Sequence, residues 1–189
     1  DIRKTLTPLL SDVPSTLWLF DLGCGKHRLG GSALAQVFSQ LGDEAPTVDA
    51  AQLANFLDLI AALHTHGCIS AYHDRSDGGA IVALFEMALA SGCGLDIETA
   101  TLCSVHDLVR ALFAEELGAV VQVPLHKKQE FTALVLASGL TAQCHPIATP
   151  TPDQTLVIHH YGGELARFDV LALHARWSDV THRMQALRD

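Results

Sequence analysis

The chain has 189 residues, 49% of them hydrophobic and 17% charged, which suits one sizeable core but hardly two. Asp and Glu outnumber Lys and Arg by 21 to 12, and the resulting formal charge of −9 repels phosphate backbones and argues against a nucleic-acid partner. No apolar run approaches the roughly 20 residues of a membrane helix. We therefore expect one domain over residues 1–189 that has no membrane partner.

The cysteines and the first residues indicate the cellular compartment of the chain and whether it is part of a longer protein. The five cysteines are odd in number, widely spaced and lack a C-x-x-C pair. Free thiols in a reducing cytoplasm are the simplest account. The chain starts with Asp1, and no apolar run of signal-peptide length follows it. The sequence thus indicates a cytoplasmic segment excised from a longer chain.

Strands and helices alternate in the first half of the chain. Residues 17–22 form a continuous apolar run that leads into glycine, which is typical of a buried strand, and a helix is expected over residues 31–41. Residues 68–72 read as a second strand, and a helical stripe restarts at residues 81–89. Between the strands, helical spacing predicts a buried stripe made of Leu53, Phe56, Leu57, Ile60 and Leu63.

The second half mixes helices and strands in a different order. Helices are predicted over residues 105–114, 127–138 and 170–187. Strands are predicted over residues 119–123, 142–147, 155–160 and 164–168. Late strands at hairpin-like spacing favour layered α+β architecture over a doubly wound parallel sheet.

Residues 73–79 (HDRSDGG), between a predicted strand and a predicted helix, carry the most informative chemistry. Asp74, at a strand end, fits the role of a hard oxygen ligand for magnesium, which usually takes one or two protein carboxylates and fills its other positions with phosphate and water. Ser76 and the first N–H groups of the helix can donate to a phosphate or ribose. In the alternative interpretation, Ser76 or Asp77 caps the helix and Arg75 is a surface partner for a carboxylate.

Residues 23–32 (GCGKHRLGGS) are a second candidate, because a glycine-rich loop with basic side chains before a helix resembles a phosphate cradle. The spacing is not that of a Walker A loop, and a turn with an N-cap needs no ligand. Residues 64–68 (HTHGC) fit a helix end better than a zinc site. Glu115 and Glu116 are expected to end a helix on its solvated side, and His159 and His160 to be structural.

Five blocks together resemble, in order, the last domain of the synthetase region of the phosphoribosylformylglycinamidine synthase family, in its long single-chain bacterial form. The blocks are FDLGCGKHRLGGSALAQVFSQLGD (residues 20–43), AYHDRSDGG (71–79), ALFEMALASGCGLDI (83–97), FAEELGAVVQV (113–123) and ARWSDVTHRMQALRD (175–189). The resemblance implies a three-layer α/β/α domain of the aminoimidazole ribonucleotide synthetase superfamily, with a mixed sheet.

That family uses ATP and glutamine to convert formylglycinamide ribonucleotide into its amidine in purine biosynthesis. The resemblance implies that Asp74 ligates Mg²⁺ and Ser76 contacts the ATP or ADP. It also implies that the other synthetase and glutaminase domains are partners in the same chain, that a small nucleotide is the substrate, and that the isolated segment is inactive. It gives residues 23–32 no substrate contact, because close relatives can carry a different residue at Cys24.

Two other functions remain open from the sequence. The first is another enzyme of the superfamily, such as aminoimidazole ribonucleotide synthetase or a selenophosphate-synthase relative, since these share an ATP site between paired domains. The second is a structural domain that holds an ADP which does not turn over, because the family's synthetase region is duplicated and has two pseudo-symmetric sites.

Overall fold

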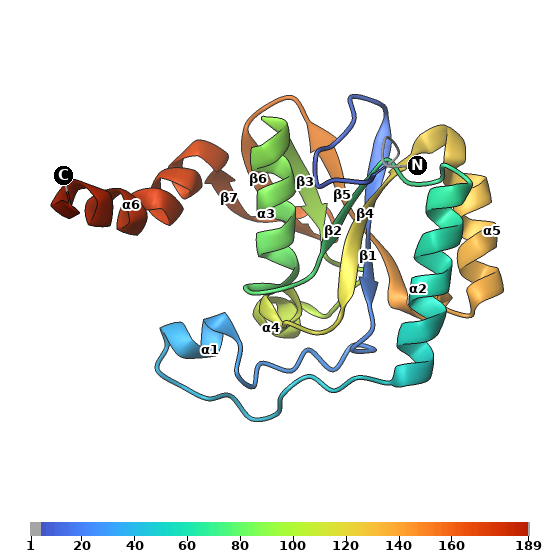
Figure 1. The fold of residues 1–189 in the computed structure, drawn as a ribbon, viewed down its shortest axis with the longest axis horizontal. Coiled ribbons are helices and arrows are strands. Elements are labelled where there is room, and N and C mark those ends of the chain that lie inside the picture. Colours follow the sequence, from blue (N-terminus) through green and yellow to red (C-terminus); the bar gives the residue numbers. More distant parts are fainter. Residues whose placement is uncertain (1–4, 189) are drawn as a thin grey trace.

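A mixed sheet of seven strands forms the centre of the computed structural model, which describes residues 5–188 (Figure 1). The strands lie in the order β2-β4-β1-β5-β3-β6-β7, and every neighbouring pair is antiparallel except β3 with β6. Their bounds are Ser15–Asp21 (β1), Ala71–Asp74 (β2), Gly94–Glu98 (β3), Gly118–Pro124 (β4), Cys144–Thr151 (β5), Thr155–His160 (β6) and Gly163–Asp169 (β7).

Helices cover both faces of the sheet. They are α1 (Ala33–Val37), α2 (Ala50–Thr65), α3 (Gly79–Ser91), α4 (Leu108–Phe113), α5 (Lys128–Ser138) and α6 (Val170–Arg188). Helices α3 and α4 pack on one face, and α2 and α5 pack on the other. The three-layer α/β/α fold with a mixed sheet is therefore confirmed. Within residues 5–188, no helix is both long and apolar enough to cross a lipid bilayer.

Each face of the sheet has its own apolar core, because successive strand residues point to opposite faces. On β1, Leu17 and Leu19 pack toward α3 and α4, whereas Phe20 packs toward α2 and α5. Phe20 contacts Phe56 of α2 edge-on, with the ring centroids 5.5 Å apart. Strand β1 thus lies between two cores, which explains why its sequence is continuously apolar.

Two local predictions differ from the structure, and one strand was not predicted. The helix expected over residues 31–41 is only Ala33–Val37, because the backbone N–H groups of Gly30 and Gly31 bind carbonyls of Glu44 and Leu41 and fold the chain back. In α2, Leu57 is 57% exposed and Leu59 is buried instead. Strand β3 was not predicted, because it is only five residues long and closely follows a glycine-capped helix.

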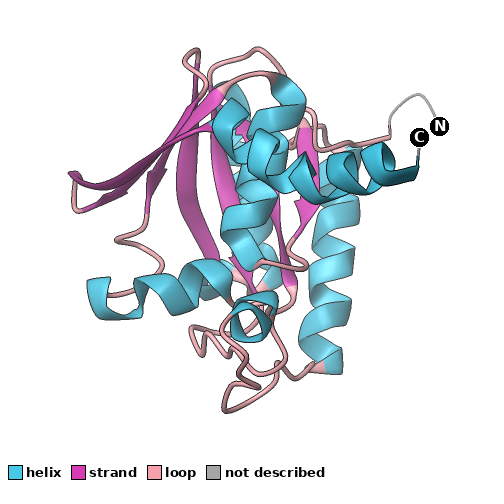
Figure 2. Cartoon of the chain, turned by 90° about the vertical axis from the view of Figure 1, so that its left-hand side faces the viewer, coloured by secondary structure: helices cyan, strands magenta, loops and turns pink. Residues whose placement is uncertain are grey.

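The topology brings two loops to one edge of the sheet. Strands β1 and β2 are each antiparallel to β4, which lies between them, so β1 and β2 are parallel and end at the same edge. The loop after β1 contains residues 23–32, and the turn after β2 contains residues 75–78. Loops gather at this end of the sheet in the turned view (Figure 2). Both segments that the sequence singled out therefore lie together.

Candidate functional site

A buried ion pair joins the ends of β1 and β2. Arg75 Nη2 lies 2.6 Å from Asp21 Oδ1, and both side chains are almost completely buried. Arg75 also donates from Nε to the carbonyl of Glu116 and from Nη2 to the carbonyl of Leu117, the latter at 3.0 Å. Arg75 is therefore an internal anchor, and the interpretation of it as a surface partner is wrong.

Glu116 holds the glycine loop onto the same network. Its carboxylate accepts hydrogen bonds from Nε and Nη2 of Arg28, at 2.8 and 2.7 Å, and from the backbone N–H of Arg28 at 3.0 Å. Both side chains are buried, so the prediction that Glu116 lies on a solvated side is wrong. The prediction failed because an acidic residue next to a helix end is usually exposed, and Arg28, the buried partner of Glu116, is 88 residues away in the sequence.

Glu115 connects the two loops through their backbones. Its Oε1 accepts hydrogen bonds from the N–H of Ala33, at the start of α1, and from the N–H of Gly78, at the start of α3, both at 2.8 Å. The glycine loop and the HDRSDGG turn are thus bound to one carboxylate. These contacts fix the two loops relative to each other.

Asp74 and Ser76 lie on the surface on either side of the buried Arg75. Asp74 is the last residue of β2, and both side chains are exposed. The N-cap of α3 is Gly78, in a left-handed conformation, and neither Ser76 nor Asp77 caps the helix, so the N-cap interpretation of these two residues is wrong. Within residues 5–188 the Ser76 hydroxyl forms no hydrogen bond. Asp74 and Ser76 therefore present a carboxylate and a hydroxyl to solvent beside the positive end of a helix dipole.

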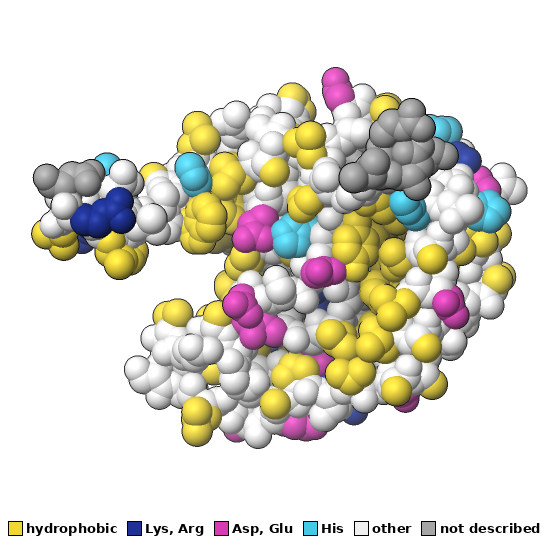
Figure 3. All heavy atoms as spheres, viewed as in Figure 1, with side chains coloured by type: hydrophobic (Ala, Val, Ile, Leu, Met, Phe, Trp, Pro, Cys, Tyr) yellow, Lys and Arg dark blue, Asp and Glu magenta, His cyan; other side chains and the backbone are white. Residues whose placement is uncertain are grey.

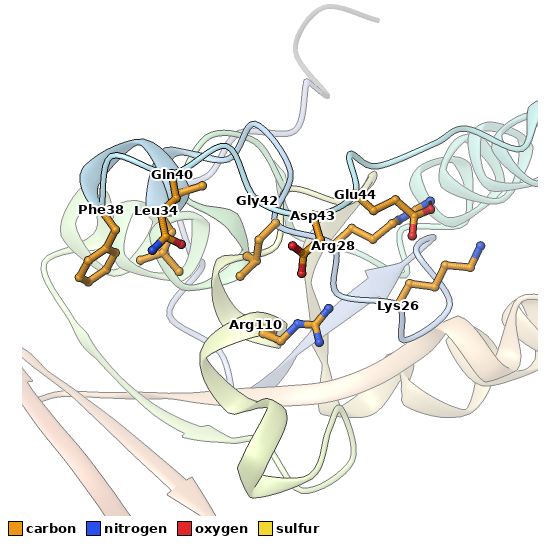
Figure 4. Close-up of a pocket in the computed structure, with 11 residues that line it drawn as sticks. Lys26, Arg28, Leu34, Phe38, Gln40, Gly42, Asp43, Glu44 and Arg110 are labelled. Atoms are coloured by element: carbon orange, nitrogen blue, oxygen red, sulfur yellow. Dashed lines mark hydrogen bonds and ion pairs between the residues drawn. The ribbon is translucent and has the colours of Figure 1, made fainter.

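A pocket of about 500 Å³ lies on the other side of the glycine loop. Lys26 and Arg28 line it from the loop, Arg110 from α4, and Asp43 from the returning chain. Figure 4 shows Arg110 pointing toward Asp43 across this space. Arg28 is buried and paired with Glu116, and the acids Asp43 and Glu44 offset the charges of Lys26 and Arg110 in the lining. Asp74 and Ser76 do not line this pocket.

The described residues offer few ligands for a metal. No group of three or more His, Cys, Asp or Glu side chains in residues 5–188 is placed to hold an ion. A metal at Asp74 would therefore receive one carboxylate, that of Asp74 itself, from this part of the chain. One carboxylate is compatible with magnesium, which usually keeps water and phosphate as its other ligands.

Burial and pairing shift the pKa of several groups in this network. Burial raises the pKa of Asp21, but the charge and hydrogen bond of Arg75 outweigh it and leave the pKa below its ordinary value. The pKa of Glu116 is lowered in the same way, burial being outweighed by hydrogen bonds from Arg28. Burial lowers the pKa of His27, and the nearby Asp21 carboxylate only partly opposes that effect.

We expect His27 to make the domain less stable as the pH falls below about 6.5, the ordinary histidine pKa. The folded-state pKa of His27 is lower, so the unfolded chain binds the proton first and gains stability over the folded one. His27→Asn removes this titration and suits the positive φ of 49° at this position. Urea unfolding from pH 7.5 to 5 should show a smaller loss of unfolding free energy in the variant. Equal losses would contradict the expectation.

The comparisons with known proteins agree with the fold. The fold defines an α/β/α domain with a mixed sheet, and residues 19–160 match the family model described as AIR synthase related protein, C-terminal domain. Because the match covers most of the chain, the chain belongs to this family.

Solved structures show the same fold at low sequence identity. T. maritima PurL complexed with FGAR is 13% identical, with a TM-score of 0.76 over 90% of this chain and 29% of that chain. T. maritima PurL complexed with ATP is 11% identical, with a TM-score of 0.69 over 89% and 27%. E. coli HypE, a hydrogenase maturation protein, is 17% identical, with a TM-score of 0.62 over 86% and 52%. The chain thus spans between a quarter and a third of the PurL chains it matches.

Proposed function

We propose that this domain forms one wall of a nucleotide site in phosphoribosylformylglycinamidine synthase, with Ser76 contacting the nucleotide and Asp74 ligating Mg²⁺. The observation that carries the proposal is the outward position of both side chains, on either side of a buried arginine and just before the start of α3, whose N-cap residue is Gly78. The family match supports it, as does the likeness to PurL, a protein that has been solved with ATP, ADP and FGAR.

In the proposed reaction, phosphorylation converts the amide oxygen of the substrate, a poor leaving group, into phosphate, a good one. ATP phosphorylates the amide oxygen of formylglycinamide ribonucleotide, and ammonia released from glutamine then displaces the phosphate. Asp74 would hold the Mg²⁺, and the bound ion would neutralise charge on the phosphate oxygens, which phosphoryl transfer requires. This chain contributes by holding Asp74 and Ser76 in place. The ion pair between Arg75 and Asp21 fixes β2 and the turn after it, so the two side chains contact the nucleotide without rearranging.

The rest of the site must come from other domains. One carboxylate and one hydroxyl are a small share of the contacts that an ATP with its metal requires. We propose that residues 1–189 are a single domain of a longer cytoplasmic chain, and that the remaining synthetase domains and a glutaminase domain complete the enzyme. The isolated domain is then inactive in amide transfer.

Asp74→Asn in the full-length parent enzyme tests the proposal. Asn keeps the shape of the side chain but removes the charge that holds the metal and its phosphate. We expect the KM for ATP to rise about 10-fold or more, which corresponds to about 1.4 kcal/mol of binding free energy. If the site instead holds an ADP that does not turn over, the variant should lose copurified nucleotide and melt at a lower temperature.

The matched control is Asp77→Asn, because Asp77 is an exposed acid in the same turn and has no role in the proposal. It should leave the KM for ATP, the nucleotide content and the melting temperature unchanged. If Asp74→Asn also leaves all three unchanged, the HDRSDGG segment is a strand-to-helix turn and nothing more.

A further inference from the structure

Helix α6 carries an apolar stripe at the spacing of a helix that packs against another helix. Large apolar side chains recur along it at intervals of four, three, four and three residues. Two heptads of this spacing place them on one side of the helix. We call this set the α6 stripe; it consists of Leu173, Trp177, Val180, Met184 and Leu187.

The outer part of the stripe is not covered by any element within residues 5–188. Helix α6 begins against α3 and then projects from the body of the molecule, as Figures 1 and 3 show. Trp177, Val180 and Met184 are each about two-thirds exposed, and Leu187 is 89% exposed. Contiguous apolar surface of this size on a polar helix marks an interaction site.

The inner end of the stripe continues into an apolar groove of about 360 Å³. Phe85 of α3, Phe113 of α4 and Phe168 of β7 line the groove, and Leu173 and Trp177 form part of its wall. The only charged residue among its lining is Glu86. Groove and stripe form one surface, which accepts a helix packed along α6 with its end near these aromatic rings. The groove adds the contact area that two heptads alone lack.

The charges beside the stripe specify the occupant. The positions that flank it on α6 include Arg176 and Arg183, whereas Asp179 lies farther round the helix and pairs with Arg183 at 2.9 Å. Arg176 has no ion pair within residues 5–188. Two α6 helices packed together would place arginines against arginines, which disfavours a second copy of this chain. Acidic side chains on the partner would instead pair with them.

We propose that the α6 stripe and its groove bind an amphipathic α-helix of another protein segment whose apolar face is flanked by Asp or Glu. The α6 stripe lies beyond residues 19–160, the part that matches the family model, whereas most of the groove lining lies within that part; neither shares a residue with the Asp74 edge. Helices that dock in apolar grooves use anchors at this same spacing.

Two designed peptides test the charge requirement. Both are 22-residue helices with Leu at the two seam positions of each heptad; one carries Glu and the other Lys at the flanking positions. Fluorescence anisotropy of the labelled peptides with the 189-residue chain should show at least 10-fold tighter binding of the Glu peptide. This advantage should shrink as salt is raised, because exposed charges are screened. Equal binding of the two peptides, or binding of neither, would overturn the proposal.

Two substitutions test the location. Val180→Glu should weaken binding of the Glu peptide at least 10-fold without changing the melting temperature, because Val180 is two-thirds exposed. Leu57→Glu, at an exposed leucine on α2, is the matched control and should leave the affinity unchanged. If the Val180→Glu variant binds the Glu peptide as tightly as the parent chain does, the α6 stripe is not the binding site. If light scattering shows a dimer that Val180→Glu dissociates, the occupant is a second copy and the proposal is wrong.

Discussion

Glu116→Ala is expected to destabilise the domain by about 3–5 kcal/mol, the usual effect of removing one partner of a buried ion pair. The substitution leaves the guanidinium of Arg28 buried, with Thr47 Oγ1 at 2.7 Å and the exposed Glu44 at 3.5 Å as its remaining side-chain partners. It also removes the acceptor of the Arg28 backbone N–H. Urea unfolding followed by circular dichroism measures the loss.

Two companion variants separate an unpaired buried charge from a general packing defect. Arg28→Met combined with Glu116→Leu removes both charges and should recover a large part of the lost stability. Glu164→Ala breaks the exposed pair with Arg167 on β7 and should leave the free energy of unfolding almost unchanged. If Glu116→Ala behaves like Glu164→Ala, the buried network does not stabilise this edge of the sheet.

Gly79→Ala is expected to destabilise the domain by about 2–4 kcal/mol, the sum of backbone strain and overpacking. Gly79 has a φ of +76°, and a Cβ there would lie 2.6 Å from the carbonyl oxygen of Leu112 and 2.7 Å from the carbonyl carbon of Phe113. Both obstacles are backbone atoms, so they cannot rotate away. The start of α3 must shift, and with it the bond from Gly78 N–H to Glu115.

Gly92→Ala is the control for strain without a clash. Gly92 also has a positive φ, of +63°, but a Cβ there would find only the end of the Gln154 side chain, at 4.0 Å. It should cost about 1 kcal/mol, the penalty for an L-residue in the left-handed region. Thermal unfolding of the two variants compares them directly. Equal losses would show that the contact between α3 and α4 can adjust.

The sequence predicted the architecture well where local pattern and tertiary contacts agree. The apolar runs within β1 and β6 are such cases, and β6 has the predicted bounds. Helix α1 is shorter than predicted, because hydrogen bonds from Gly30 and Gly31 to residues beyond the helix decide where the chain turns back. Helical periodicity contains no information about such bonds.

The candidate site was predicted in part. The position of Asp74 at the end of a strand and of Ser76 before a helix followed from the order of apolar and turn residues, and their roles remain proposals. The supporting network was not predicted, since Asp21 and Arg75 are 54 residues apart and Arg28 and Glu116 are 88 apart. The available signal was that both acids lie directly beside strongly apolar strands, where a charge must be paired.

The position of β1 in the sheet also has a consequence for how the domain is made. Strand β1 is the first strand of the chain, yet its neighbours are β4 and β5, and the side chains of Ser15 and Gln122 that meet there are 107 residues apart. A ribosome adds about 5–20 residues per second, so β1 is complete roughly 5–20 s before β4. During that interval its apolar residues have no strand to pair with, and contacts so distant in sequence also form slowly. The nascent strand is therefore exposed to wrong pairing until the second half of the domain has been synthesised.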